Sequence, residues 1–212
     1  MATDLTVLCV LKSGGSYDAE WVRKLRDGVT RNLTKSLRFA CLSDVEVPCE
    51  RIPLTEGWPG WWSKIELFKP GTITGPTLYL DLDTVVTGSL DPFCAIPDDF
   101  AMLRSFWQED FVGSGVMWFK DGPPKGVYSK FAKMPQCYIE HHERARNGVY
   151  VGDQAFVWDA LKGKIAKLDN LGIKSYKFHC TSGLPQGTAV VCFHGKPSPP
   201  EVKADWMARH WR

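Results

Sequence analysis

The sequence predicts an α/β fold with a mixed, mostly parallel sheet flanked by helices, and two observations indicate it. The first forty-odd residues alternate strand, helix and strand patterns, which is the order of a βαβ unit. Later apolar runs with strand character end in side chains that carry chemistry, Asp81 and Asp83 in one run and His194 in another. Ligands of open α/β sheets sit beyond the carboxyl ends of strands, so both run ends are candidate site positions.

The N-terminal part resembles a Rossmann-like nucleotide-binding half. Residues 5–11 form a buried strand pattern, a glycine-bearing loop follows, residues 18–33 repeat apolar side chains at helical spacing, and residues 37–42 give a second strand. The loop lacks the spacing of GxGxxG and of GxxxxGK[ST], so by itself it favours an ordinary glycine turn. Residues 48–60 are expected to be irregular, and residues 61–68 to form a short helix.

The rest of the chain continues the alternation. Within residues 78–86 an apolar run with strand character, residues 78–80, ends in the two aspartates, and further strands are predicted at residues 100–104, 115–119 and 189–193. Part of residues 127–142 and residues 155–161 have helical patterns, the second one directly after a Gly-Asp-Gln segment. No internal repeat or low-complexity tract interrupts this order.

Length and charge are those of an ordinary globular domain. A chain of 212 residues and 23.9 kDa buries a full core but is short for two domains, so residues 1–212 are predicted to form one domain. Its tail, about residues 198–212, is expected to dock as a terminal helix rather than cover a donor or contact an anionic acceptor. The formal charge of +2 is far from the profile of a dedicated nucleic-acid binder.

Cysteine usage and the N-terminus predict a cytoplasmic protein. The seven cysteines are odd in number, scattered and never spaced as CxxC, which argues against a disulfide framework and a zinc site. Asp4 stands where a secretory signal would be basic, and no apolar run approaches the ~18 residues that a membrane helix needs. Membrane insertion is therefore not expected.

Asp81 and Asp83 are the strongest chemical signal in the chain. On a strand their side chains project to one face, while Leu82 turns back toward the core. Two carboxylates so placed can share one divalent ion, which neutralises a diphosphate. An Asp-x-Asp is also common in surface turns, but its position at the end of an apolar strand favours the metal.

The acidic pair and the late histidine resemble the glycogenin-like (family 8-like) glycosyltransferases of GT-A fold. In that family an Asp-x-Asp binds manganese and the nucleotide sugar, a C-terminal histidine completes the metal site, and a glycine and a lysine hold the diphosphate. The resemblance implies that Asp81, Asp83 and His194 bind the metal, and that Asp81, Gly195 and Lys196 contact the donor. Two carboxylates and an imidazole suit Mn²⁺ better than Mg²⁺, which is the alternative ion.

Other segments extend this resemblance over residues 5–197. Tyr17 falls where the family places a tyrosine near uracil, and Lys64 matches a lysine that reaches the donor. Ser114 and Gly115 are similar to an Asn-Ser/Ala-Gly-Val stretch that contacts the sugar.

The Gly-Asp-Gln segment supplies the implied catalytic residues. Asp153 and Gln154 are similar to the family's Asp-Gln motif beside the sugar, where they orient the sugar, steady positive charge at its reacting carbon, or position the acceptor. The departing nucleoside diphosphate develops negative charge, which a metal and two lysines stabilise. Retention of configuration is implied by the family alone.

Two departures from the family pattern bear on specificity. Gly113 replaces an asparagine that contacts the sugar, which leaves the identity of the sugar open. The family's His-x-x-Gly-x-x-Lys-Pro-Trp pattern is compressed to His-Gly-Lys-Pro at residues 194–197, which weakens the match of Lys196.

Some aromatic and histidine residues have no assigned role. A Pro-Gly turn is flanked by tryptophans that either stack on a sugar or form a packed corner of the core, namely Trp58, Trp61 and Trp62. His141 and His142 lie among charged side chains, a context typical of a solvated face.

The sequence therefore predicts a cytoplasmic, metal-dependent glycosyltransferase that uses a nucleotide sugar, most readily a UDP-sugar, as co-substrate. The acceptor is open among a glycan, a protein, a metabolite and a modified DNA base, and so is the oligomeric state. The rival class is a magnesium-dependent phosphatase of the haloacid dehalogenase type, because residues 81–85 resemble its nucleophile loop. That loop usually opens the fold, whereas a βαβ unit precedes Asp81 here. A non-catalytic nucleotide-binding module is the third possibility.

Overall fold

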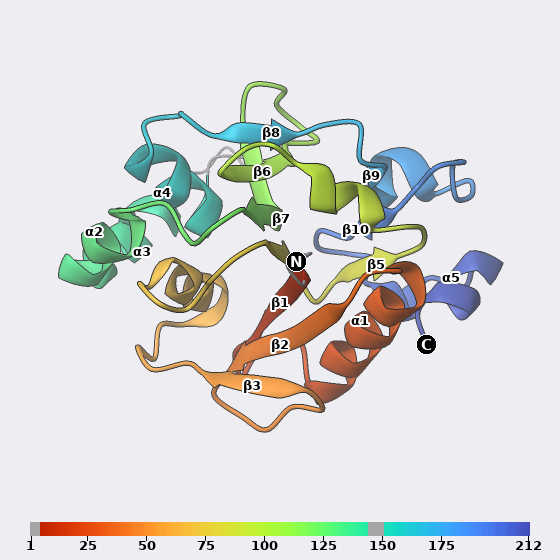
Figure 1. The fold of residues 1–212 in the computed structure, drawn as a ribbon, viewed down its shortest axis with the longest axis horizontal. Helices are drawn as coiled ribbons and strands as arrows, with labels where there is room; N and C mark the ends of the chain where they lie inside the picture. The colour runs from red at the N-terminus through yellow and green to blue at the C-terminus, as the bar shows by residue number, and fades with distance from the viewer. Residues whose placement is uncertain (1–4, 144–150) are drawn as a thin grey trace.

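The computed structural model describes residues 5–143 and 151–212 and has a mixed α/β fold (Figure 1). A seven-stranded sheet in the order β3-β2-β1-β4-β7-β6-β8 forms its centre, and a smaller sheet, β5-β10-β9, lies beside it. In the large sheet β4 and β6 each pair antiparallel with β7, and the other neighbours are parallel. The predicted mixed, mostly parallel sheet flanked by helices is confirmed.

The N-terminal βαβ unit forms as the sequence predicts. β1 (Leu5–Leu11) and β2 (Leu37–Ser43) are parallel neighbours, and α1 (Ala19–Asn32) connects them. The helix begins at Asp18 because its carboxylate accepts hydrogen bonds from the free amides of the first turn.

Part of the segment expected to be irregular is a strand. β3 (Glu50–Pro53) pairs in parallel with the end of β2. It is an edge strand that is largely exposed, and its charged residues and proline are typical of sheet edges, where they limit pairing with other chains. The sequence pattern did not predict β3, because its charged residues and proline give no alternation of apolar and polar side chains.

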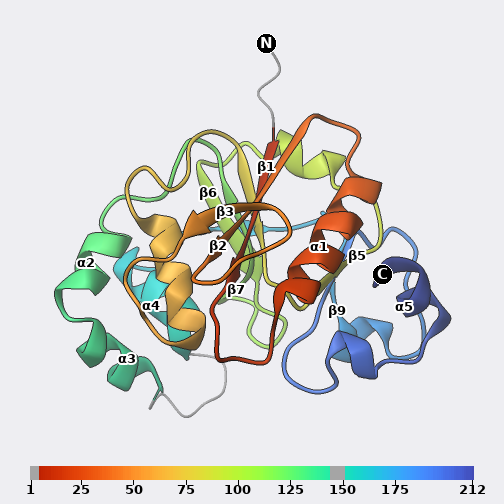
Figure 2. The ribbon, with the colours of Figure 1, turned by 90° about the horizontal axis from the view of Figure 1, so that it is seen from below.

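The large sheet is completed by β4 (Thr77–Leu80), β6 (Phe100–Arg104), β7 (Val112–Phe119) and β8 (Ala166–Leu168). Alternate side chains of the buried strands serve different cores: Val7 and Cys9 belong to the core beneath α1, whereas Leu8 belongs to the core beneath the opposite helices. Figure 2 shows α1 on one side of the sheet and α2, α3 and α4 on the other. The sheet therefore has two buried faces, which explains its continuous apolar runs.

The helices opposite α1 arise from the middle of the chain. η1 (Gly60–Phe68) is a 3₁₀-helix where a short helix is predicted, whereas a second short 3₁₀ segment, η2 (Asp91–Ala95), packs on the α1 side of the sheet. The expected helical stretch near residues 127–142 is two helices, α2 (Val127–Lys133) and α3 (Pro135–Glu143). α4 (Gly152–Ala160) starts earlier than predicted, so the Gly-Asp-Gln segment forms its first turn.

The predicted strand does end at the acidic pair, and the pair itself lies in a turn rather than on the strand. After β4 the chain turns: the Asp81 amide donates to the Gly115 carbonyl at 2.9 Å, and the Thr84 amide donates to the Asp81 carbonyl at 3.0 Å. β5 (Thr84–Val86) then joins the small sheet, antiparallel to β10 (Val190–Cys192). The two aspartates therefore lie in the turn that joins one sheet to the other.

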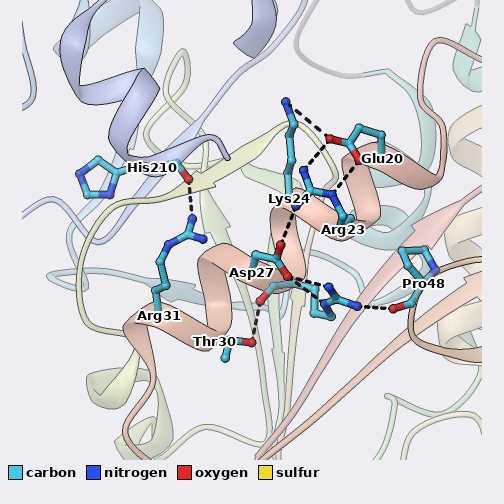
Figure 3. Close-up of polar contacts among 9 residues, drawn as sticks. Glu20, Arg23, Lys24, Asp27, Thr30, Arg31, Pro48 and His210 are labelled. Carbon is cyan, nitrogen blue, oxygen red and sulfur yellow. Dashed lines mark hydrogen bonds and ion pairs between the residues drawn. The ribbon is translucent and has the colours of Figure 1, made fainter.

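The C-terminal segment packs beside the small sheet. β9 (Ile173–Ser175) leads into a π-helical turn, η3 (Tyr176–Cys180), and η4 (Pro199–Glu201) precedes α5 (Asp205–His210). Trp206 and Met207 of α5 are buried against the small sheet, as expected for a docked terminal helix. Figure 3 shows the Arg31 guanidinium of α1 directed at the His210 carbonyl oxygen, to which it donates at 2.9 Å.

His142 is not part of a solvated face, and that interpretation is wrong. Its side chain is buried between α3 and α4, with Nδ1 at 2.9 Å from the Tyr138 carbonyl and Nε2 at 3.2 Å from Asp159 Oδ2, whereas His141 is exposed. The flanking charges are an unreliable guide here because one face of α3 packs inward. None of the helices within residues 5–143 and 151–212 is long and apolar enough to cross a bilayer.

Candidate functional site

A cavity of about 620 Å³ opens where the two sheets meet. It lies beyond the carboxyl ends of β1, β4 and β10, and the first turn of α4 closes it on one side. Every site residue predicted from the sequence lines this cavity, with the exception of Lys196. The fold therefore brings together residues from position 17 to position 195 of the chain.

Lys64 is the centre of a buried polar network on one wall. Its Nζ donates to Ser114 Oγ at 2.8 Å and lies 3.1 Å from Asp153 Oδ2 and 3.3 Å from Asp81 Oδ1. Burial alone lowers the pKa of this amine, but the charges of Asp153 and Asp81 more than offset that effect, so the pKa is raised and the lysine stays charged. Its charge holds three segments of the chain in one arrangement.

Asp153 lies in the first turn of α4 and is 6% exposed. Burial raises the pKa of its carboxyl group, and the ammonium of Lys64 partly offsets the rise. The preceding Gly152 has φ +68°, and a Cβ on it would lie 3.0 Å from Trp61 Nε1. Only glycine suits this close approach, so the Gly-Asp order has a structural reason. Gln154, the other predicted catalytic residue, lines the cavity beside Gly113.

The two aspartates of the turn have different surroundings. Asp81 accepts a hydrogen bond from the Tyr79 hydroxyl and is paired with Lys64. Asp83 accepts one from the Tyr17 hydroxyl at 2.8 Å, and no cation of the described residues lies within ion-pair distance of it. Burial and the nearby charge of Asp81 raise the pKa of Asp83 to about 7. Among the described residues, the protein therefore supplies a cation partner to Asp81 and none to Asp83.

His194 follows β10 and faces the same cavity. Its Nε2 lies 2.7 Å from Ser175 Oγ, and its Nδ1 is buried without a hydrogen-bond partner in the described part of the chain. Burial, with the nearby charge of Lys177, lowers the pKa of the ring to about 4, so the ring is neutral at pH 7. A neutral imidazole is the form that binds a metal ion.

The donor set suits a divalent cation in its chemistry, with two carboxylates and one unpartnered imidazole nitrogen. Within residues 5–143 and 151–212, however, no three His, Cys, Asp or Glu side chains are grouped closely enough to hold an ion. The site of Asp81, Asp83 and His194 remains a prediction, and so does the identity of the ion.

Lys196 is directed away from the cavity. Its Nζ pairs with Glu201 at 2.9 Å, and its side chain is 79% exposed. Gly195, in contrast, lines the cavity with φ +74°, where the absence of a side chain leaves room for a ligand. The sequence could not show that Gly195 lines the cavity and Lys196 does not, because the compressed motif changes the direction of the chain after the glycine.

Aromatic rings on the rim include one that the sequence reasoning missed. Trp58 and Trp62 are buried core residues, whereas Trp61 is 53% exposed and lines the cavity. Trp107, 54% exposed, also lines the cavity and has its ring 4.2 Å from that of His194. Trp107 could have been selected from the sequence because it lies just beyond the end of β6. Position beyond the carboxyl end of a strand is the same criterion that identified the acidic pair.

Comparison with solved structures identifies the fold. The chain superposes on the glycosyltransferase GlyE of Streptococcus pneumoniae TIGR4 with a TM-score of 0.61 and 15% identity, over 94% of this chain and 56% of GlyE. It superposes on the galactosyltransferase LgtC, solved with donor and acceptor sugar analogues, with a TM-score of 0.63 and 12% identity, over 96% of this chain and 93% of LgtC. The chain has a GT-A glycosyltransferase fold.

A third similar structure is WbbM, a bifunctional glycosyltransferase, with a TM-score of 0.61 and 10% identity over 94% of this chain and 47% of WbbM. The chain thus spans about half the length of GlyE and of WbbM but nearly all of LgtC. No protein-family model and no curated protein matches the sequence. At these identities the likeness establishes the fold, and the activity has to be argued from the site.

Proposed function

We propose that this protein is a glycosyltransferase that transfers a sugar from a nucleoside diphosphate sugar, most readily a UDP-sugar, to an acceptor. The observation that carries the proposal is the convergence of Tyr17, Lys64, Asp83, Asp153 and His194 on one cavity of a GT-A fold. Pairs of acids are common, but an aromatic ring, a buried cation and a neutral imidazole around such a pair are the parts that a nucleotide sugar requires.

The nucleoside end of the donor belongs at the β1 side of the cavity. Tyr17 offers a ring there that is 37% exposed and is held by Trp21 at 4.7 Å between centroids. A base stacked on such a ring leaves its diphosphate pointing toward the aspartates of the β4–β5 turn. This order, base then phosphates then sugar, also puts the sugar next to Asp153 and Gln154.

A divalent ion, Mn²⁺ in preference to Mg²⁺, would be held by Asp81, Asp83 and His194 and would supply positive charge to the leaving diphosphate. The protein's own share of that charge is Lys64, which stays protonated beside Asp81. Since charge develops on the leaving group as the glycosidic bond breaks, a fixed cation there lowers the barrier without reorganising.

On the sugar side of the cavity, the carboxylate of Asp153 is held in a fixed position. Lys64 fixes Asp153, and Ser114 and Gly115 of β7 form the adjoining wall. Asp153 and Gln154 then orient the sugar and steady positive charge at its reacting carbon. The acceptor enters from the rim, and its class is left open by these contacts; retention of configuration is part of the proposal.

The test measures thermal stability with uridine, guanosine and adenosine diphosphates, each with Mn²⁺, with Mg²⁺ and with EDTA. A ligand at ~100 times its Kd stabilises a protein by ~2.7 kcal/mol, which is a readily measured shift. We expect one nucleotide to stabilise the protein, and only together with the metal. Hydrolysis of the matching nucleotide sugar then separates an enzyme from a binding module.

A phosphatase gives the opposite pattern. It would release phosphate from simple esters with Mg²⁺ and would need no nucleotide. Phosphate release without any nucleotide-dependent shift would overturn the proposal.

A further inference from the structure

The small sheet places a second lysine beside the predicted diphosphate site. β9 and β10 are parallel, and Ser175 is paired with Cys192. Lys177 lies two residues beyond Ser175, in the π-helical turn η3, and His194 lies two residues beyond Cys192, so both residues follow the carboxyl ends of neighbouring strands. β5 runs antiparallel from the same edge, with Thr84 paired to Cys192, which brings Asp83 there as well. One sheet edge therefore presents Asp83, His194 and Lys177.

The geometry agrees with this register. Lys177 Nζ lies 3.6 Å from the position that a Cβ on Gly195 would occupy. Lys177 does not itself line the cavity, but Gly195 does, and it has no side chain to separate the ammonium from the cavity. The π-helical turn that carries the lysine is anchored, because the Phe178 amide donates to Ser175 Oγ at 3.3 Å and that same oxygen contacts His194.

The charge at Lys177 has no ion-pair partner in the part of the chain that the structure describes. No carboxylate of the described residues forms an ion pair with this exposed lysine. Burial and the charge of Lys177 together lower the pKa of the His194 ring, which agrees with a position of the lysine close to it. An ammonium beside a neutral imidazole and an open glycine backbone is complementary to an anion, and a phosphate group supplies one.

Lys196, the lysine that the sequence motif selects, forms an ion pair outside the cavity. It pairs with Glu201, whose carboxylate also accepts hydrogen bonds from the Ser198 amide and hydroxyl at 2.6 Å each. That carboxylate caps η4, so Lys196 is part of a local loop structure. Turning Lys196 to the cavity would break its pair with Glu201.

We propose that Lys177, and not Lys196, is the lysine that contacts the diphosphate of the nucleotide donor. The inference rests on the proposed function, since it assigns a residue to the donor site. It replaces the assignment drawn from the His-Gly-Lys-Pro motif with one drawn from the register of β9 and β10. The lysine serves as a point charge on the phosphates and takes no part in the transfer step itself.

The test is isothermal titration calorimetry with Mn²⁺ and whichever of the three nucleoside diphosphates the wild-type protein binds. Lys177→Ala and Lys196→Ala are a matched pair, because each removes one exposed lysine from neighbouring segments. We expect Lys177→Ala to bind about tenfold more weakly, as for the loss of one charge-assisted contact. Lys196→Ala should stay within about twofold of wild type, and Lys177→Arg should recover most of the affinity because it restores the charge.

Equal affinities of wild type and Lys177→Ala, or a loss confined to Lys196→Ala, would overturn the inference while leaving the proposed function in place. If the wild-type protein binds none of the three diphosphates, the proposed function fails and the inference fails with it. Unchanged melting temperatures of the ligand-free variants establish that the affinities compare folded proteins.

Discussion

The two walls of the cavity differ in how far the protein satisfies its own charges. On the large-sheet wall, Lys64, Asp81 and Asp153 form a closed network whose members are all within 3.3 Å of the lysine nitrogen. On the small-sheet wall, Asp83 has no cation partner among the described residues and His194 Nδ1 is buried without a hydrogen bond. A closed network stabilises the fold, whereas an open one is completed by a ligand.

This difference predicts that variants of the closed wall act on stability and variants of the open wall act on binding. The largest expected effect is that of Lys64→Met, which leaves the buried carboxylate of Asp153 and the partly exposed one of Asp81 without their cation. We expect it to lower the free energy of unfolding by about 3–5 kcal/mol, as when one partner of a buried ion pair is removed. Urea unfolding measures this change.

Lys120→Met is the matched control for that experiment. Lys120 is half exposed, and its ion pair with Asp99 is long, at 4.0 Å. Its loss should change the free energy of unfolding by no more than about 0.5 kcal/mol. A similar small change for Lys64→Met would mean that the large-sheet wall is not a stabilising network.

Asp83→Ala tests the open wall and should act on binding. The variant removes a predicted metal ligand that has no cation partner among the described residues and whose ionisation burial disfavours, so the ligand-free variant should be at least as stable as the wild type at pH 7. We expect the stabilisation of ~2.7 kcal/mol by saturating nucleotide and metal to disappear. Asp99→Ala, in which an exposed carboxylate outside the cavity is lost, should keep the full shift. A full shift with Asp83→Ala would exclude Asp83 as a metal ligand.

The pH dependence of the metal-free protein sharpens the comparison further. Because the pKa of Asp83 is about 7 in the folded protein and ~3.9 in the unfolded chain, the folded state holds an extra proton between these values. The stability that this carboxyl contributes is therefore present at low pH and is lost as the pH rises toward 7. Urea unfolding in EDTA at pH 5, 6, 7 and 8 should show this loss in the wild type.

Asp83→Asn cannot titrate and should lack this component. The difference in unfolding free energy between wild type and variant should therefore change between pH 5 and pH 7 and then level off. Parallel profiles for the two proteins would show that the Asp83 carboxyl is not desolvated as its position indicates.

The smallest effect expected is that of Tyr17→Phe. The variant removes the hydroxyl that donates to Asp83 but keeps the ring that packs on Trp21. Stability should fall by no more than about 1 kcal/mol, because the tyrosine is partly exposed and the hydrogen bond is a single one. Nucleotide affinity should be nearly retained in Tyr17→Phe and clearly reduced in Tyr17→Ala, as measured by calorimetry. Equal losses in both would assign the contribution of Tyr17 to its hydroxyl.

Local sequence patterns predicted most of the large sheet, and all but one of the site residues selected from the sequence line the cavity. β1 and β6 have the predicted bounds, because continuous apolar runs are what a strand buried on both faces requires. Asp81, Asp83 and His194 were identifiable because each follows such a run, and polar residues at strand ends reach one edge of a sheet. Short strands with charged residues, such as β3, carry no comparable signal.

The pairing between segments that are distant in the sequence could not be predicted from the sequence. The transfer of the chain from β4 to β5, the parallel register of β9 with β10, and the burial of His142 each depend on contacts that no local pattern encodes. The sequence by itself therefore determined which residue types bear the chemistry and where strands end. Only the tertiary structure decided that Lys196, which the motif selects, pairs with Glu201 and does not line the cavity, because long flexible side chains follow the charges that surround them rather than their place in a motif.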